Sequence, residues 1–123
     1  MRKYVIGILL LILVGCGLET ETFAEFYSGE VTRIEIVSGE TGEKRSIEDL
    51  ERVNRFIDQV EDVQFHPQEN QEKRDGFRYS IRLYNEDKKV FGCTLTMVDG
   101  HYYDTEPDLY SIVDKWFKRL TAQ

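Results

Sequence analysis

Histidine and cysteine are scarce in this sequence, and the motifs of common enzymes are missing. The chain has two histidines and two cysteines among its 123 residues, so a His-rich metal site is excluded. His101 and Asp104 could flank a cation, but their spacing of three on one strand directs them to opposite faces. There is no G-x-S-x-G, no H-E-x-x-H, no phosphate-binding glycine loop and no calcium-loop pattern. The sequence therefore predicts no catalytic residue, no metal site and no cofactor.

Basic residues are outnumbered as well. The sequence has 16 Lys and Arg against 23 Asp and Glu, which gives a net charge of −7. This sign argues against nucleic acid as a partner, and against a polybasic attachment to anionic lipid or cell-wall polymer. Two of the acidic residues could meet as a general acid and base, but no pair stands out, so a solvated acidic surface is expected.

The apolar run from Tyr4 to Val14 is too short for a permanent membrane span. As a helix it would be about 16 Å long, roughly half of a ~30 Å hydrocarbon core. It follows Arg2 and Lys3 and is succeeded by the small residue Gly15. Basic, apolar and small residues in this order are typical of a secretory signal peptide. We therefore expect residues 1–15 to be removed, which leaves enough chain for one domain.

The end of this run, Leu13-Val14-Gly15-Cys16, resembles the lipobox of bacterial lipoproteins. In that family a diacylglyceryl group is attached to the cysteine sulfur, and the chain is cut just before it. The resemblance implies lipidation at Cys16 and a place on the extracytoplasmic face of the cell membrane; the alternative is a plain secreted protein. Two acyl chains anchor a protein stably, whereas one holds it only marginally. Cys93 would then lack a disulfide partner within the chain, and its neighbours Phe91 and Leu95 predict a buried, unreactive thiol.

Residues 16–30 are predicted to form the lipidated cysteine and a tether, and residues 31–123 a single domain. The tether has several acidic residues and no clear periodicity, as a flexible linker does. It also contains Phe23, Phe26 and Tyr27, which are unusual in a solvated linker. Part of it is therefore expected to pack on the domain, with contact to the membrane interface as the alternative.

Hydrophobic periodicity predicts the secondary structure. Alternation predicts strands at 31–37, 77–84, 90–98 and 101–104, and Asp99-Gly100 predicts a two-residue hairpin turn. Brief extended pieces at 44–45 and 63–65 fit the pattern as well. Apolar residues at spacings of three and four predict a helix over about 47–61, capped by Ser46, and a second helix capped by Thr105. The polar run 66–76 is predicted to be a long loop, mobile rather than functional.

These elements give the order β-α-β-β-β-α and an α+β fold. The simplest arrangement that buries every apolar face has two layers, a mostly antiparallel sheet of about four strands with both amphipathic helices on one face. No internal repeat interrupts it. The other face of the sheet would be open and would carry a mixed polar set, namely Arg33, Glu35, Arg78, Arg82, Thr94 and Thr96.

Three arginines, Arg33, Arg78 and Arg82, fall on this open face by alternation. If their strands are adjacent, they would form a basic patch that can bind the carboxylates of a partner protein in two-point geometry. The alternative is a solvated face with cross-strand pairs between Glu35 and Arg78 or Arg82, each worth less than about 1 kcal/mol.

As a whole the chain looks like the small lipoproteins of bacterial envelopes, especially of Gram-positive bacteria, that have two-layer domains and no assigned activity. Some of these are immunity, exclusion or inhibitor proteins, which bind another envelope protein and block it. The resemblance implies a non-enzymatic protein whose partners are the membrane and another envelope protein. One alternative is an accessory or structural envelope lipoprotein. Another is a small-ligand receptor or enzyme, for which a domain of this size leaves little room.

Overall fold

The computed structural model describes residues 19–73 and 76–120. The expected signal peptide and the candidate lipidation residue Cys16 lie outside this range. The described chain contains eight β-strands and two α-helices, and every strand pair is antiparallel. The α+β class and the antiparallel pairing are therefore confirmed.

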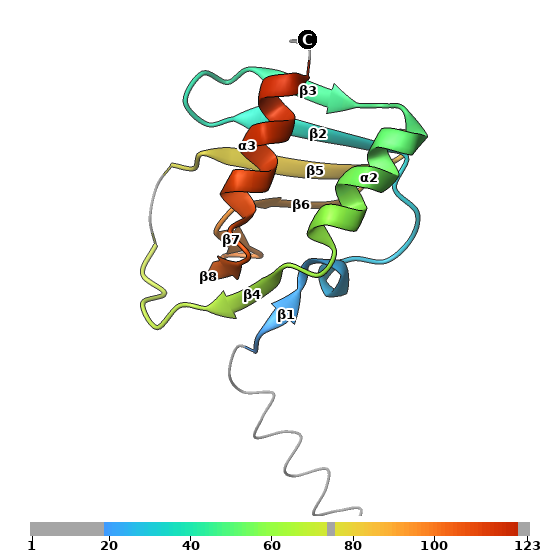
Figure 1. Ribbon diagram of the computed structural model, residues 1–123. Helices are drawn as coiled ribbons and strands as arrows, with labels where there is room; N and C mark the ends of the chain where they lie inside the picture. Colours follow the sequence, from blue (N-terminus) through green and yellow to red (C-terminus); the bar gives the residue numbers. More distant parts are fainter. Residues whose placement is uncertain (1–18, 74–75, 121–123) are drawn as a thin grey trace, which may run out of the picture.

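The first sheet has the strand order β3-β2-β5-β6 (Figure 1). Its strands are β2 (Arg33–Ser38), β3 (Lys44–Ile47), β5 (Tyr79–Asn85) and β6 (Lys88–Thr94). At its centre β2 pairs with β5, from Arg33 opposite Tyr84 to Ser38 opposite Tyr79. This register places four fully buried aliphatic side chains on the same face, Ile34, Ile36, Ile81 and Leu83.

A second sheet, which the sequence did not predict, has the order β1-β4-β8-β7. Its strands are β1 (Glu21–Thr22), β4 (Gln64–Pro67), β7 (Met97–Val98) and β8 (His101–Glu106). It lies beyond β6, at the end of the domain where the described chain begins (Figure 1). The expectation of a single sheet of about four strands is therefore wrong, and the order β-α-β-β-β-α omits several strands.

The predicted strand 90–98 is divided between the two sheets. After Thr94 the chain turns, because the Thr94 hydroxyl accepts hydrogen bonds from the backbone N–H groups of Thr96 (3.4 Å) and Met97 (3.0 Å). Met97 and Val98 then pair with β8. The predicted hairpin turn that follows is confirmed: Asp99 and Gly100 have φ of 50° and 82°, the positive values that a type I′ turn requires.

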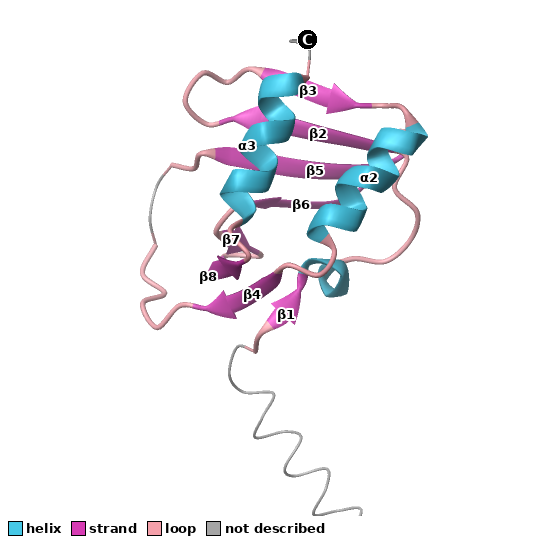
Figure 2. Cartoon of the chain, viewed as in Figure 1, coloured by secondary structure: helices cyan, strands magenta, loops and turns pink. Residues whose placement is uncertain are grey.

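Both helices cover the same face of the first sheet, as predicted (Figure 1, Figure 2). They are α2 (Leu50–Val60) and α3 (Leu109–Arg119). Each begins later than predicted. Asp49, not Ser46, caps α2, and Asp108, not Thr105, caps α3.

The predicted caps were wrong because both residues belong to strands. Ser46 pairs with Glu35 across β3 and β2, and Thr105 pairs with Phe65 across β8 and β4. The Thr105 hydroxyl still accepts a hydrogen bond from the backbone N–H of Leu109 at 3.0 Å. A capping signature in the sequence thus marked a residue close to the true helix start.

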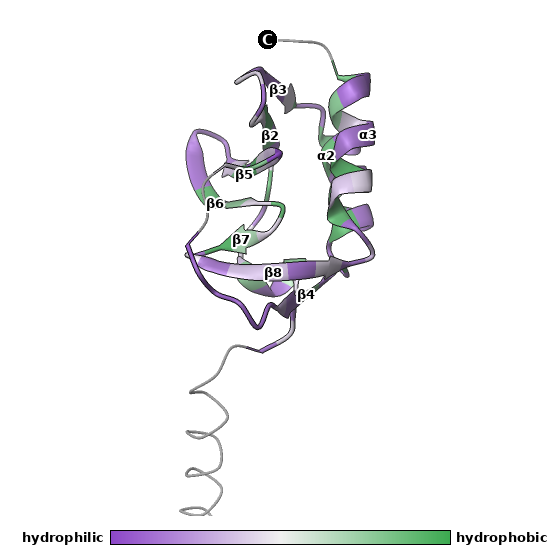
Figure 3. Cartoon of the chain, turned by 90° about the vertical axis from the view of Figure 1, so that its left-hand side faces the viewer, coloured by the Kyte–Doolittle hydropathy of each residue, from purple (hydrophilic) through white to green (hydrophobic). Residues whose placement is uncertain are grey.

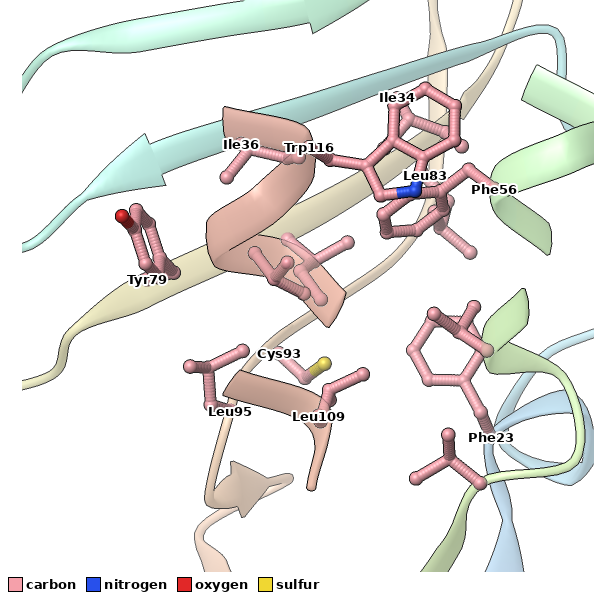
Figure 4. Packing of buried hydrophobic residues seen from close by; sticks show 14 of the residues in the cluster. Phe23, Ile34, Ile36, Phe56, Tyr79, Leu83, Cys93, Leu95, Leu109 and Trp116 are labelled. Atoms are coloured by element: carbon pink, nitrogen blue, oxygen red, sulfur yellow. The ribbon is translucent and has the colours of Figure 1, made fainter. Parts of the chain in front are cut away.

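The hydrophobic core lies between the first sheet and the helices, where Figure 3 shows hydrophobic residues on the facing sides. Trp116 of α3 is almost completely buried, and its ring lies 5.6 Å from that of Phe56 of α2 in an edge-on arrangement. The Trp116 Nε1–H donates to Gln59 Oε1 at 2.8 Å, so its one polar group is satisfied. Figure 4 shows both rings beside Ile34 and Leu83. The prediction that the α3 stripe faces the sheet is confirmed.

The expected tether also contributes to this core. Phe23 is the first residue of a short 3-10 helix, η1 (Phe23–Phe26), and its side chain has no exposed surface. Its ring centroid lies 5.7 Å from Tyr27, 6.2 Å from Phe65 and 5.9 Å from Phe91. The expectation that tether aromatics pack on the domain is therefore confirmed, and the chain from Glu21 onward is part of the folded unit.

Candidate functional site

The face of the first sheet turned away from the helices gathers basic side chains around one carboxylate. Register places Glu35 of β2 directly opposite Arg82 of β5. Arg33 of β2 and Lys44 of β3 approach the same carboxylate. Lys89 of β6 lies opposite Tyr84 on the same face. We call the surface made by Arg33, Glu35, Lys44, Arg82 and Lys89 the outer face.

Glu35 is the centre of the outer face. Its side chain is only 8% exposed, and its two oxygens lie 2.9 Å from Arg82 Nη1, 3.7 Å from Arg33 Nη1 and 4.0 Å from Lys44 Nζ. One carboxylate cannot neutralise three cations. The cluster therefore keeps a net positive charge in a protein whose net charge is −7. The expected cross-strand pair between Arg82 and Glu35 is confirmed.

Arg33 is held by a second contact. Its guanidinium carbon lies 4.0 Å from the centre of the Tyr84 ring, directly across the sheet. Such a cation-π contact is worth about 0.5 to 1 kcal/mol at a partly exposed site. With the Glu35 contact it fixes the guanidinium in the plane of the outer face, while 29% of the Arg33 side chain stays exposed.

Arg78 does not belong to the outer face, in contrast to the prediction from alternation. Its guanidinium lies 4.7 Å from the ring centre of Tyr110, a residue of α3 on the opposite side of the sheet. The reason is that β5 begins at Tyr79, so strand alternation does not extend to Arg78. Of the three predicted arginines, the structure brings Arg33 and Arg82 together and separates Arg78 from them.

Lys44 and Lys89 are the residues of the outer face that sequence reasoning did not identify. Alternation does not identify Lys44, because its strand β3 (Lys44–Ile47) has only four residues, too few to show a clear period. Lys89 falls between the predicted strands 77–84 and 90–98, but β6 begins at Lys88 and an irregularity in the pairing after Leu83 brings Lys89 opposite Tyr84. Counting back by two from Thr94 places Lys88 and not Lys89 on the outer face, so simple alternation could not have found Lys89.

The predicted loop 66–76 is partly ordered by contacts with β8. His66 and Pro67 belong to β4. The Gln71 side chain exchanges two hydrogen bonds with the backbone of Tyr102, donating to its carbonyl at 2.9 Å and accepting from its N–H at 2.8 Å. The Gln68 amide donates to the Tyr103 carbonyl at 3.2 Å and to Asp104 at 3.0 Å. These bonds continue the pairing of β4 with β8 beyond the end of β4.

Two groups capable of chemistry, Cys93 and Tyr79, are buried. Burial raises the pKa of the Cys93 thiol to about 12, with a smaller contribution from Asp99, so the thiol is protonated at neutral pH. This agrees with the buried, unreactive cysteine that the sequence predicts. Burial also raises the pKa of Tyr79 above its ordinary value, and its hydroxyl donates to Asp114 at 2.6 Å. Among residues 19–73 and 76–120, no group of three or more His, Cys, Asp and Glu side chains is placed to hold a metal ion.

Comparisons with known proteins identify no relative: no family model, no curated protein and no solved structure matches the chain. In the part of the chain that the structure describes, neither helix has the length and apolar character needed to cross a bilayer. The outer face concentrates positive charge on an acidic protein, and for this reason we take it as the candidate functional site.

Proposed function

We propose that this protein is a membrane-anchored extracytoplasmic lipoprotein, without enzymatic activity, that binds another envelope protein through its outer face. The anchor is proposed on the sequence Leu13-Val14-Gly15-Cys16, which follows a basic and then apolar segment. The observation that carries the binding role is the concentration of Arg33, Lys44 and Arg82 around a single buried carboxylate. Lys89 adds a fourth positive charge to the same face. Such a surface attracts acidic patches of other proteins.

The geometry supports this proposal. The described chain starts at Glu19, so at most about 10 Å of extended chain separates it from Cys16. Lipid on Cys16 would hold the second sheet close to the bilayer. The first sheet would then stand farther from the membrane, with its outer face turned sideways and open to neighbouring envelope proteins.

The anchor is tested by the substitution Cys16→Ala. We expect the variant to lose incorporation of labelled fatty acid and normal processing, and to leave the detergent phase unless the uncut signal peptide retains it. The matched control is Cys93→Ala, which should still incorporate the label. Undiminished labelling of the Cys16→Ala protein would rule out lipidation at this residue.

The binding role is tested by site-specific photocrosslinking on intact cells. A photoreactive amino acid at Lys44 samples the outer face, and one at the exposed Lys115 of α3 samples the helix side. We expect a discrete crosslinked protein from Lys44 but not from Lys115, and weaker crosslinking as salt is raised. Equal products from both positions, or none from Lys44, would contradict a docking role for the outer face.

A further inference from the structure

The outer face contains a groove along β5 and β6, with a volume of about 260 Å³. Arg82 and Lys89 lie at one end, Ser80 and Thr94 in the middle, and Phe77 and Met97 at the other end. Register explains the arrangement, because Ser80 is opposite Thr94 and Arg82 is opposite Gly92. The groove therefore has a basic end, a hydroxyl-lined middle and an apolar end.

Gly92 is the floor of the basic end. A methyl group in place of its hydrogen would lie 2.8 Å from Lys89 Cε and 3.0 Å from Lys89 Nζ. The Lys89 ammonium therefore lies over Gly92, beside Arg82 on the neighbouring strand. The missing side chain at Gly92 leaves the space that the end of the Lys89 side chain occupies.

The two cations have donors to spare. Arg82 uses Nη1 for Glu35 at 2.9 Å, and a guanidinium has five N–H donors in all. Lys89 forms no ion pair with any residue in the described ranges. The acidic groups of the site are Glu35 behind Arg82 and Asp99 on the groove lining. Because Glu35 offsets part of the Arg82 charge, the basic end matches a singly charged carboxylate better than a doubly charged phosphate.

The opposite end favours an apolar side chain. Phe77 is one of the two large hydrophobic residues that are exposed in the described chain, with 43% of its surface accessible. Met97 beside it is flexible and adapts to a bound side chain. Asp99 lines the same groove and would repel a second carboxylate that approached it.

We propose that this groove binds an extended acidic segment of the partner protein, with one carboxylate between Arg82 and Lys89 and an apolar side chain against Phe77 and Met97. The inference rests on the proposed function and specifies how its partner is recognised. Because the groove reaches from Arg82 past Ser80 to Phe77, it accommodates a short extended segment of a few residues.

Binding is measured with the full-length lipidated protein in nanodiscs and a fluorescent capped Ser/Thr peptide that carries one Glu and one Leu four positions apart, so that both side chains lie on the same face of the extended chain. We expect saturable binding that weakens with salt, and no comparable binding of the peptide in which Gln replaces Glu. Lys89→Glu should weaken binding by about tenfold or more, because it replaces attraction with repulsion at the carboxylate. Lys89 is exposed, so this variant should fold.

Two further variants distinguish binding in the groove from a general effect of the protein's charge. Gly92→Val keeps every charge but fills the floor, and it should weaken binding by about tenfold because Lys89 is displaced. Lys115→Glu makes the same charge change as Lys89→Glu but on α3, and it should leave the affinity unchanged. Equal losses in the Lys89 and Lys115 variants, or parent-like binding by Gly92→Val, would overturn the groove as the binding site.

Inorganic phosphate is the competitor that tests the ligand class. We expect it to displace the peptide only through ionic strength, to the same extent as chloride at equal ionic strength. Displacement far beyond that level would show an anion site for phosphate and overturn the acidic-segment proposal. If the peptide fails to bind while crosslinking from Lys44 still captures a protein, the groove proposal is wrong and the binding function stands. If crosslinking from Lys44 fails but the peptide binds, the groove stands as a peptide-binding site and the proposed binding of an envelope protein is wrong.

Discussion

The two sheets of this domain are built in different ways. The first has strands of up to seven residues, such as β5 and β6, and it packs aliphatic side chains against two helices. The second includes two strands of only two residues, β1 and β7, and its buried side is largely aromatic. Phe65, Phe26 and Tyr103 pack there with ring centroids 5.1 to 5.9 Å apart. Short strands contribute few hydrogen bonds, so large rings supply the contact area that holds the second sheet.

The sheets also differ in charge. The outer face of the first sheet is basic, whereas the second sheet carries Glu21, Asp104 and Glu106 on its strands. Under the proposed anchoring, this acidic end lies near the bilayer. Anionic headgroups would repel it, so in this proposal the lipid on Cys16, and not charge, holds the domain at the membrane. The basic outer face remains available for a protein partner.

Truncating one aromatic residue in each region gives the largest expected effects. Phe23→Ala should destabilise the protein by roughly 3 to 5 kcal/mol, because it leaves a cavity among Tyr27, Phe65 and Phe91. Trp116→Ala should destabilise by about the same amount in the first region, that is, the first sheet with α2 and α3. Both are measured by chemical denaturation. A parent-like midpoint for Phe23→Ala would mean that the second region, that is, the second sheet with η1, does not contribute to the stability of the first region.

Much of the first region can be predicted from the sequence. Alternation in 31–37 and 77–84 identifies its two central strands, and the apolar stripes identify α2 and α3. These signals are strong because each element has one buried face and enough residues to show a period. The same alternation places Arg82 and Glu35 on one face, and the register of β2 with β5 then pairs them.

The second region could not be predicted in the same way. A strand of two residues shows no period, and the pairing of β4 with β8 joins segments about forty positions apart, such as Phe65 and Thr105. The sequence does predict parts of it, namely the strand at 101–104, the Asp99-Gly100 turn, the extended piece at 63–65 and the packing of the tether aromatics. None of these signals indicates that the pieces form a separate sheet. On the candidate site, prediction failed where strands end or become irregular, at Arg78 before β5 and at Lys89 beside the shift in pairing.

An effect of intermediate size is expected at Arg45, which lies in the first region. This β3 residue donates from Nη1 to the carbonyls of Phe117 (2.5 Å) and Leu120 (3.1 Å), and so caps the C-terminal end of α3. Arg45→Ala should destabilise by about 1 to 3 kcal/mol, because the carbonyls lose a charged donor that favours a helix C-terminus. Arg45→Lys should recover part of the loss in denaturation experiments; full recovery would show that charge alone, without the two-carbonyl geometry, fixes α3 to β3.

The smallest expected effect is a pH dependence at Asp114, which joins α3 to β5. Its carboxylate accepts hydrogen bonds from the Tyr79 hydroxyl at 2.6 Å and from Lys118 Nζ at 2.9 Å. These bonds, with that from Tyr79 the larger cause, lower the pKa of Asp114 below its usual value of 3.8. A carboxyl whose pKa is lower in the folded protein stabilises the fold above its usual pKa, and the stabilisation is lost as pH falls through the folded-state pKa.

Asp114→Asn should therefore be less stable than the parent at neutral pH, and the difference should shrink as the pH is lowered from about 4 toward 2. The matched control is Asp58→Asn, since Asp58 is an exposed carboxylate of α2 that forms no ion pair among the described residues. Tyr79→Phe should raise the pKa of Asp114 in an NMR titration, because the bond that most favours the charged form is removed. A stability difference that persists unchanged at low pH would show that Asp114 acts on the fold through packing and not through its charge.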